Sequence, residues 1–87
     1  MEKYKIVFRK SVLKDLKRIP KKDVRKIVAA IESLAENPRP LLSKKLSGDE
    51  KYRLSSGVYR ILYSIEDEML IVCVVKVRHR KDVYRKK

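Results

Sequence analysis

The sequence predicts a single α+β domain in which two short helices pack on one face of a mainly antiparallel, twisted sheet. Three observations predict it. Residues 4–8 alternate between apolar and polar, residues 10–36 carry apolar side chains every three or four positions, and residues 51–77 read as strands separated by turn residues. A chain of 87 residues has room for one core, so residues 1–87 are expected to form one domain.

The first half of the chain predicts one strand and a helical hairpin. Tyr4–Phe8 is expected to be a strand with one buried face. Ser11 is expected to cap a short helix that Pro20 ends, and a second helix is expected from about Lys22 to Glu36, where Asn37-Pro38 stops it. The residues expected on the buried stripes of these helices are Val12, Leu13, Leu16, Ile19, Val24, Ile27, Val28, Ile31, Leu34 and Ala35.

The next segment predicts a surface loop and then a β-hairpin. Residues 39–49 have the composition of a loop held down by leucines. If Ser56-Gly57 is a two-residue turn, Ser55 pairs with Val58 and Arg53 lies opposite Arg60. Like charges opposite each other destabilise a sheet, so an anion is expected between the two guanidinium groups. The alternatives are that both side chains fan out into solvent or that the register slips.

A second hairpin is expected to follow. Glu66-Asp67-Glu68 marks its turn, and residues 69–77 form a strand that is apolar on both faces and therefore central. The length of the turn is not decided by the sequence. Two arrangements therefore remain open, with either Lys76 and Arg78 or Val75 and Val77 on the face of Arg60.

Charge and composition favour a folded protein that binds a polyanion, with nucleic acid as the leading candidate. The 24 Lys and Arg residues outnumber the 11 acids, for a net charge of +13, and 44% of residues are apolar. A single cysteine, Cys73, permits no intramolecular disulfide and fits a reducing cytoplasm. The longest apolar run, residues 69–75, is too short to cross a membrane, and the N-terminus lacks an export signal.

The same composition points away from metal and cofactor chemistry. One histidine and one cysteine make no standard zinc cluster, and two glycines make no phosphate-binding loop. We therefore expect an activity that needs no metal and no cofactor. Cleavage of RNA by its own 2′-hydroxyl is such a reaction, because the protein only moves protons and stabilises charge on the phosphoryl oxygens.

Five residues are candidates for that chemistry. Arginine forks suit phosphate oxygens, His79 titrates near neutral pH, and Tyr84 could transfer a proton or stack on a base. All of them can converge at one end or face of the sheet: Arg53, Arg60, His79, Arg80 and Tyr84. The alternative is a solvated basic tail in which Tyr84 only packs against the core.

The order of these motifs resembles the RelE branch of the RelE/ParE bacterial toxins. The resemblance rests on Tyr52-Arg53-Leu54, on residues 57–63, on the apolar strand at 69–77, and on His79-Arg80 followed by Asp82-Val83-Tyr84. It covers nearly the whole chain. It implies a compact β-α-α-β-β-β domain with the RelE-like microbial RNase fold, a cognate antitoxin partner, and cleavage of mRNA in the ribosomal A site.

The resemblance also implies residue roles. Arg53, Arg60 and Arg80 would stabilise the scissile phosphate, Tyr84 would orient or activate the 2′-hydroxyl or stack on a base, and His79 is the candidate general acid. Residues expected to bind RNA around them are Lys44, Lys45, Lys51, Ser55, Arg78 and Lys81.

Two departures from the family pattern stand out. Ser55 occupies a position where many active relatives carry a basic residue, and Arg78 replaces the more usual glycine. The alternatives are therefore a catalytically impaired RNA- or ribosome-binding protein, or an inhibitor of DNA gyrase as in the ParE branch, which generally lacks this Arg and Tyr set.

Overall fold

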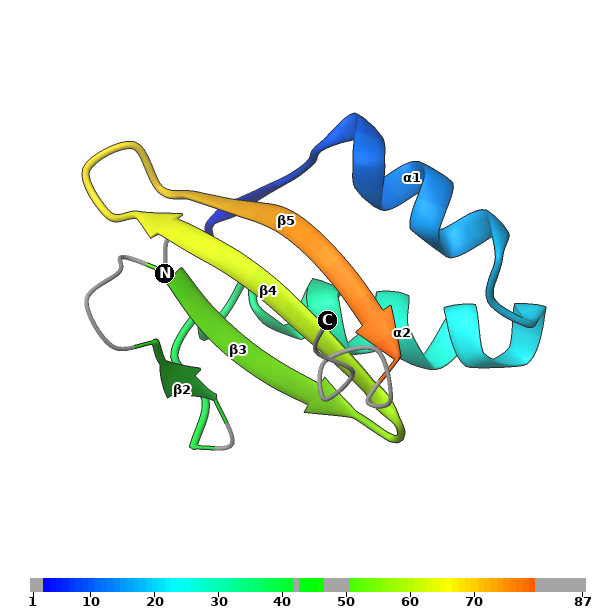
Figure 1. The fold of residues 1–87 in the computed structure, drawn as a ribbon. Coiled ribbons are helices and arrows are strands. Elements are labelled where there is room, and N and C mark those ends of the chain that lie inside the picture. The colour runs from blue at the N-terminus through cyan, green and yellow to red at the C-terminus, as the bar shows by residue number, and fades with distance from the viewer. Residues whose placement is uncertain (1–2, 42, 47–50, 80–87) are drawn as a thin grey trace.

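The computed structural model describes residues 3–41, 43–46 and 51–79, and within them it contains two helices and one five-stranded sheet (Figure 1). The elements are β1 (Lys5–Phe8), α1 (Lys10–Lys17), α2 (Lys21–Ser33), β2 (Lys44–Lys45), β3 (Lys51–Ser56), β4 (Tyr59–Glu66) and β5 (Ile71–His79). The strand order is β1-β5-β4-β3-β2, with β1 parallel to β5 and every other pair antiparallel. The predicted α+β fold class is confirmed.

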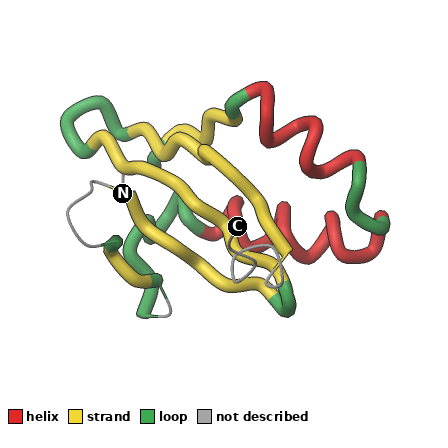
Figure 2. Tube along the Cα trace, in the orientation of Figure 1, coloured by secondary structure: helices red, strands yellow, loops and turns green. Residues whose placement is uncertain are grey.

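Both helices lie on the same side of the sheet, as Figure 2 shows, and the core fills the space between the two layers. The helices present an apolar stripe and the strands an apolar face, so their packing removes both from water. The buried apolar residues are Val12, Ile27, Ile31, Leu34, Leu54, Ile61, Tyr63, Val72, Val74 and Val77.

Two details of the first helix differ from the prediction. α1 begins at Lys10, with Arg9 in the N-cap position and no side-chain cap, so Ser11 lies inside the first turn and does not cap the helix. Leu13 is 52% exposed and is not part of the buried stripe. Val12, one residue earlier, occupies the core position.

The connection after α2 is not entirely a loop. Lys44 and Lys45 form the two-residue edge strand β2, in which Lys44 pairs with Arg53 and Lys45 with Tyr52. The backbone N–H of Leu46 donates to the carbonyl of Lys51 at 2.9 Å, which extends this pairing by one residue. The prediction of a surface loop over residues 39–49 was therefore wrong at this edge of the sheet.

The register of the β3–β4 hairpin also differs from the prediction. Ser56 pairs with Tyr59, Ser55 with Arg60 and Arg53 with Leu62. The two-residue turn is Gly57-Val58, in which Gly57 takes a φ of +61°, a conformation that favours glycine. A shift of one residue along each strand keeps every side chain on its expected face, so Arg53 and Arg60 share a face without being direct partners.

The β4–β5 pairing resolves the question that the sequence left open. Arg60 pairs directly with Arg78, and Leu62 pairs with Lys76, so Lys76 and Arg78 lie on the face of Arg60. The pairing then shifts, because Tyr63 pairs with Val74 and leaves Val75 as an extra residue. β5 lies between β1 and β4, which confirms the predicted central strand.

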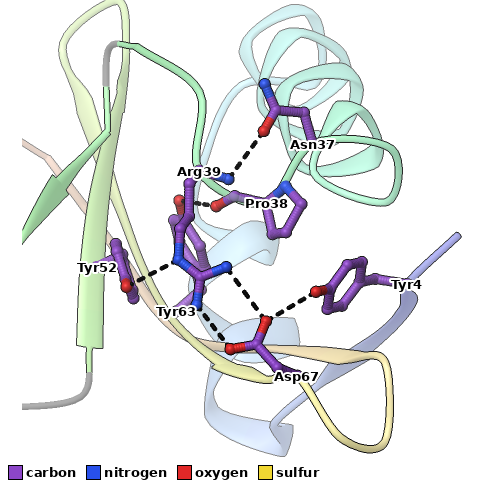
Figure 3. Close-up of polar contacts among 7 residues, drawn as sticks. All are labelled: Tyr4, Asn37, Pro38, Arg39, Tyr52, Tyr63 and Asp67. Atoms are coloured by element: carbon purple, nitrogen blue, oxygen red, sulfur yellow. Dashed lines mark hydrogen bonds and ion pairs between the residues drawn. The ribbon is translucent and has the colours of Figure 1, made fainter.

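A polar clasp ties together the end of the sheet where β4 turns into β5 (Figure 3). Asp67 accepts hydrogen bonds from Tyr4 at 2.7 Å and from Arg39 at 2.8 and 3.2 Å, and the Arg39 Nε donates to the Tyr52 hydroxyl at 3.0 Å. The hydrogen bonds from Arg39 and Tyr4 lower the pKa of the Asp67 carboxyl below its ordinary value. The clasp therefore joins four segments that are distant in sequence.

The ring of Tyr63 is fully buried below this clasp, and its hydroxyl donates to the carbonyl of Pro38 at 2.7 Å. Burial raises the pKa of this phenol, which keeps it protonated as a donor. The ring also stacks on Tyr52 with centroids 5.7 Å apart. Tyr63 thus fixes the segment after α2 against the centre of the sheet.

Candidate nucleic-acid interface

The face of the sheet opposite the helices carries three arginines around one pocket. Because side chains alternate along a strand, Arg53 on β3, Arg60 on β4 and Arg78 on β5 all project away from the helical layer. They line a pocket of about 220 Å³ together with Leu46 and Leu62. Five side chains from four segments of the chain therefore meet on the open face.

Positive charges are direct neighbours across two strand pairs at this pocket. Arg60 lies opposite Arg78, and Lys44 lies opposite Arg53. Each like-charged pair costs a few tenths of a kcal/mol to about 1 kcal/mol in an isolated sheet, and an anion bound between the charges would offset that cost. The predicted pairing of Arg53 with Arg60 was therefore wrong, and the like-charged neighbours are Arg60 with Arg78 and Lys44 with Arg53.

Ser55 helps to hold one of these side chains. Arg60 Nη1 donates a hydrogen bond to Ser55 Oγ, and the two residues are direct partners across the β3–β4 ladder. A basic residue at position 55 would instead place a further positive charge beside Arg60. Ser55 thus acts in this structure as an acceptor that orients an arginine.

His79 is not brought to the arginine pocket. It follows Arg78 on β5, so its side chain projects to the other face, where it pairs with Tyr59 and lines a separate pocket of about 200 Å³ with Asp15 and Arg18. Its ring meets Tyr59 edge to face with centroids 5.3 Å apart. The predicted gathering of His79 with Arg53 and Arg60 around one phosphate was therefore wrong.

His79 lies where α1 packs against β5, next to polar side chains at the end of α1. Asp15 Oδ2 accepts a hydrogen bond from the backbone N–H of Val77 at 3.4 Å, which anchors α1 to this strand. Burial and, next, the carboxylate of Asp23 raise the pKa of Tyr59. Tyr59 is therefore a protonated packing partner at neutral pH and not a base.

The predicted RNA-binding lysines are divided between the two faces. Lys44 pairs with Arg53 and shares its face, whereas Lys45 pairs with Tyr52 and projects toward the helical side. Lys51 is two residues from Arg53 on the same face of β3, but it does not line the arginine pocket. Arg80, Lys81 and Tyr84 lie outside the described residues.

Sequence reasoning missed the two leucines of the pocket. Leu62 is the residue two positions after Arg60, so the alternation of β4 already placed it on the arginine face. Leu46 gave no such signal, because the pairing that brings it beside Lys51 is not visible in the sequence.

Metal-ligand clusters and long apolar helices are both absent from the described residues. Within residues 3–41, 43–46 and 51–79, no three His, Cys, Asp or Glu side chains cluster so as to hold a metal ion. No helix in this part of the chain has the length and apolar character needed to cross a membrane.

Comparison with known proteins places this architecture in a class. Residues 6–84 match the family model of the ParE toxin of the type II toxin–antitoxin system, parDE. Toxin RelG of Mycobacterium tuberculosis is 32% identical over 87 residues, which cover 95% of this chain and 98% of that toxin. A RelE1-type toxin sequence of Methanocaldococcus jannaschii is 34% identical over 87 residues, with 95% and 97% covered.

The solved structures agree with the sequence matches. The archaeal RelE–RelB complex of Pyrococcus horikoshii contains a chain that superposes with a TM-score of 0.80 at 28% identity, covering 88% of this chain and 94% of that one. The fold and the sequence together define a small toxin of the type II class. The chain belongs to the RelE/ParE family of toxins from type II toxin–antitoxin systems, as the resemblance predicted, and the individual relatives given above are of the RelE kind.

Proposed function

We propose that this protein is an endoribonuclease toxin that cleaves mRNA in the ribosomal A site without a metal ion. The observation that carries the proposal is the pocket on the open face of the sheet, lined by Arg53, Arg60 and Arg78. Guanidinium groups stay charged at any working pH and bind phosphate oxygens in pairs. A site of this composition suits the extra negative charge of a phosphorane-like transition state.

The proposed reaction is an internal transfer of the phosphoryl group. The 2′-oxygen attacks the adjacent phosphorus and loses its proton, while the bond to the 5′-oxygen breaks and that oxygen gains a proton. The products are a 2′,3′-cyclic phosphate and a free 5′-hydroxyl. Charge on the non-bridging oxygens is held by Arg53, Arg60 and Arg78.

Proton transfer is assigned to the C-terminal segment. The described lining of the arginine pocket holds only arginine and leucine side chains, and no histidine, tyrosine or carboxyl group that could transfer a proton. His79 faces the other side of the sheet, so it is not the proposed general acid. Tyr84 is the proposed group for the 2′-hydroxyl and Arg80 a further phosphate ligand, both from the family resemblance.

A cognate antitoxin is the proposed partner in the cell. The related structures from Pyrococcus horikoshii and Methanococcus jannaschii are complexes of a RelE toxin with its RelB antitoxin. For this chain we expect an acidic or amphipathic antitoxin, because a strongly basic surface attracts a partner of opposite charge.

The test is a translation-coupled cleavage assay with mapped RNA ends. Purified toxin added to a translating extract should cut mRNA at ribosome-protected positions and leave cyclic phosphate ends. Arg60→Ala should lower the rate by at least about a hundredfold, as expected for loss of a charge-stabilising donor. Cleavage by Arg60→Ala at the rate of the wild type would refute the proposal.

One specific observation favours a second candidate, inhibition of DNA gyrase. The family model that matches residues 6–84 is that of the ParE toxins. This candidate predicts loss of supercoiling activity when the protein is added to purified gyrase, and no cleavage of mRNA during translation. The two assays run on one preparation therefore separate the candidates.

A further inference from the structure

The lining of the arginine pocket includes two leucines that phosphate binding alone does not explain. Leu62 is the apolar residue on a face of β4 that otherwise carries Arg60, Ser64 and Glu66. Leu62 and Leu46 are both only half-buried, and both line the pocket with the three arginines. A leucine side chain offers no charge and no hydrogen-bond donor to a phosphate, so these two residues present apolar surface to another part of the ligand.

The volume of the pocket exceeds what a chelated phosphate group needs. At about 220 Å³ it equals the liquid volume of about seven water molecules, and it is smaller than the ~300 Å³ from which drug-sized pockets begin. This is room for one flat ring system beside a phosphate.

Aromatic side chains on these strands are committed elsewhere. Proteins that hold single-stranded RNA usually stack bases on Phe, Tyr or Trp. Here Tyr52 and Tyr63 stack on each other, and Tyr59 meets His79, all on the helix side of the sheet. Within the described residues, the apolar surface available on the arginine face of this pocket is that of the leucines.

We propose that Leu46 and Leu62 form the floor of a nucleobase subsite within the arginine pocket, which rests on the proposed function. One base of the A-site codon lies against the leucine side chains, while its phosphate is held by the guanidinium groups at the rim. Aliphatic contacts read no base edge, so this subsite accepts any base and favours the larger purines by contact area. Leu62 is thus a positioning residue that sets which phosphodiester reaches the arginines.

The test compares intact and abasic substrates. Ribosomes are programmed with synthetic mRNAs whose A-site codon is intact or lacks the base at one of its three positions, and single-turnover cleavage is measured with wild-type toxin and with Leu62→Ala. On the intact codon, Leu62→Ala should slow cleavage about tenfold, because the shortened side chain covers less of the apolar face of the base. On the codon abasic at the subsite position, wild type and Leu62→Ala should cut at equal rates.

Matched variants separate this effect from general damage. Leu62→Met keeps an apolar floor and should restore most of the rate on the intact codon. Leu13→Ala removes a leucine that is 52% exposed on α1 and should cut every substrate like the wild type. Arg60→Gln should be slow on intact and abasic codons alike, because it loses contact with the phosphate and not with the base.

Three outcomes decide the matter. Equal rate loss for Leu62→Ala on intact and on all abasic codons, with wild-type melting behaviour, would overturn the subsite and leave the proposed function standing. Full activity of Leu62→Ala on the intact codon would overturn it too. Absence of cleavage by the wild type would overturn the subsite together with the proposed function.

Discussion

Replacing the three pocket arginines should change how RNA binding depends on salt, by an amount that the structure sets. Each cation that neutralises a phosphate of single-stranded RNA contributes about 0.7 to the slope of log affinity against log salt. The pocket is lined by Arg53, Arg60 and Arg78. The triple change to glutamine should therefore lower the slope by about 2. Between about 50 and 200 mM salt, the Kd of the wild type should therefore rise about 20-fold more than the Kd of the triple variant.

A matched control distinguishes a defined site from total charge. A groove between the helices is rimmed by Lys17, Lys21 and Arg25, so changing these three residues to glutamine removes the same net charge from the other layer of the molecule. Fluorescence anisotropy with a short single-stranded RNA at four salt concentrations measures both slopes. The control variant should keep a slope near that of the wild type. Equal losses of slope in the two triple variants would refute the assignment of the phosphate site to the open face.

Three further changes test the scaffold that holds this site. Asp67→Asn should lower the Tm at neutral pH because it breaks the ion pair with Arg39. The pKa of Asp67 in the folded protein lies below its ordinary value of 3.8. In thermal melts at falling pH, the difference in Tm between the variant and the wild type should therefore shrink as the pH passes through that range. Tyr63→Phe leaves the Pro38 carbonyl without its donor and should lower the free energy of unfolding by about 1–2 kcal/mol in urea titrations, and no loss would mean that the hydrogen bond adds nothing. Gly57→Ala meets no atom within 4 Å but must keep a φ of +61°, so urea titrations should show a cost of about 1–2 kcal/mol from backbone strain alone; a neutral result would show that the turn relaxes.

The placement of the arginines shows what a sequence pattern can predict in a sheet. Side chains alternate along a strand, so the pattern fixes the face of Arg53 and Arg60 even though the turn was misplaced by one residue. The direct partner across the ladder depends on the turn, which here is Gly57-Val58. Gly57 takes a positive φ at the first position of this turn, whereas the predicted turn Ser56-Gly57 placed the glycine at the second position.

His79 shows where such reasoning stops. β5 is apolar on both faces, so its pattern does not say which side chains point toward the helices. An extra residue at Val75 then reverses the alternation partway along the strand. Only the pairing of Arg60 with Arg78 decides that the next residue, His79, faces Asp15 and the helical layer.

The polar clasp could not be read from the sequence at all. Tyr4 and Asp67 are 63 residues apart and meet only because β1 joins the sheet parallel to β5. Arg39 reaches Asp67 across a separation of 28 residues from a segment with no regular structure. Nothing in the local composition of these residues distinguishes them from ordinary surface charges.

The most direct measurement is a structure of the protein bound to a short RNA that carries a 2′-O-methyl group at the cleavage position and therefore cannot be cut. We predict that the blocked phosphodiester lies on the open face of the sheet, with its oxygens about 2.7–2.9 Å from at least two guanidinium groups among Arg53, Arg60 and Arg78. A phosphodiester bound in the groove beside Lys17 and Lys21, or beside His79, would contradict it.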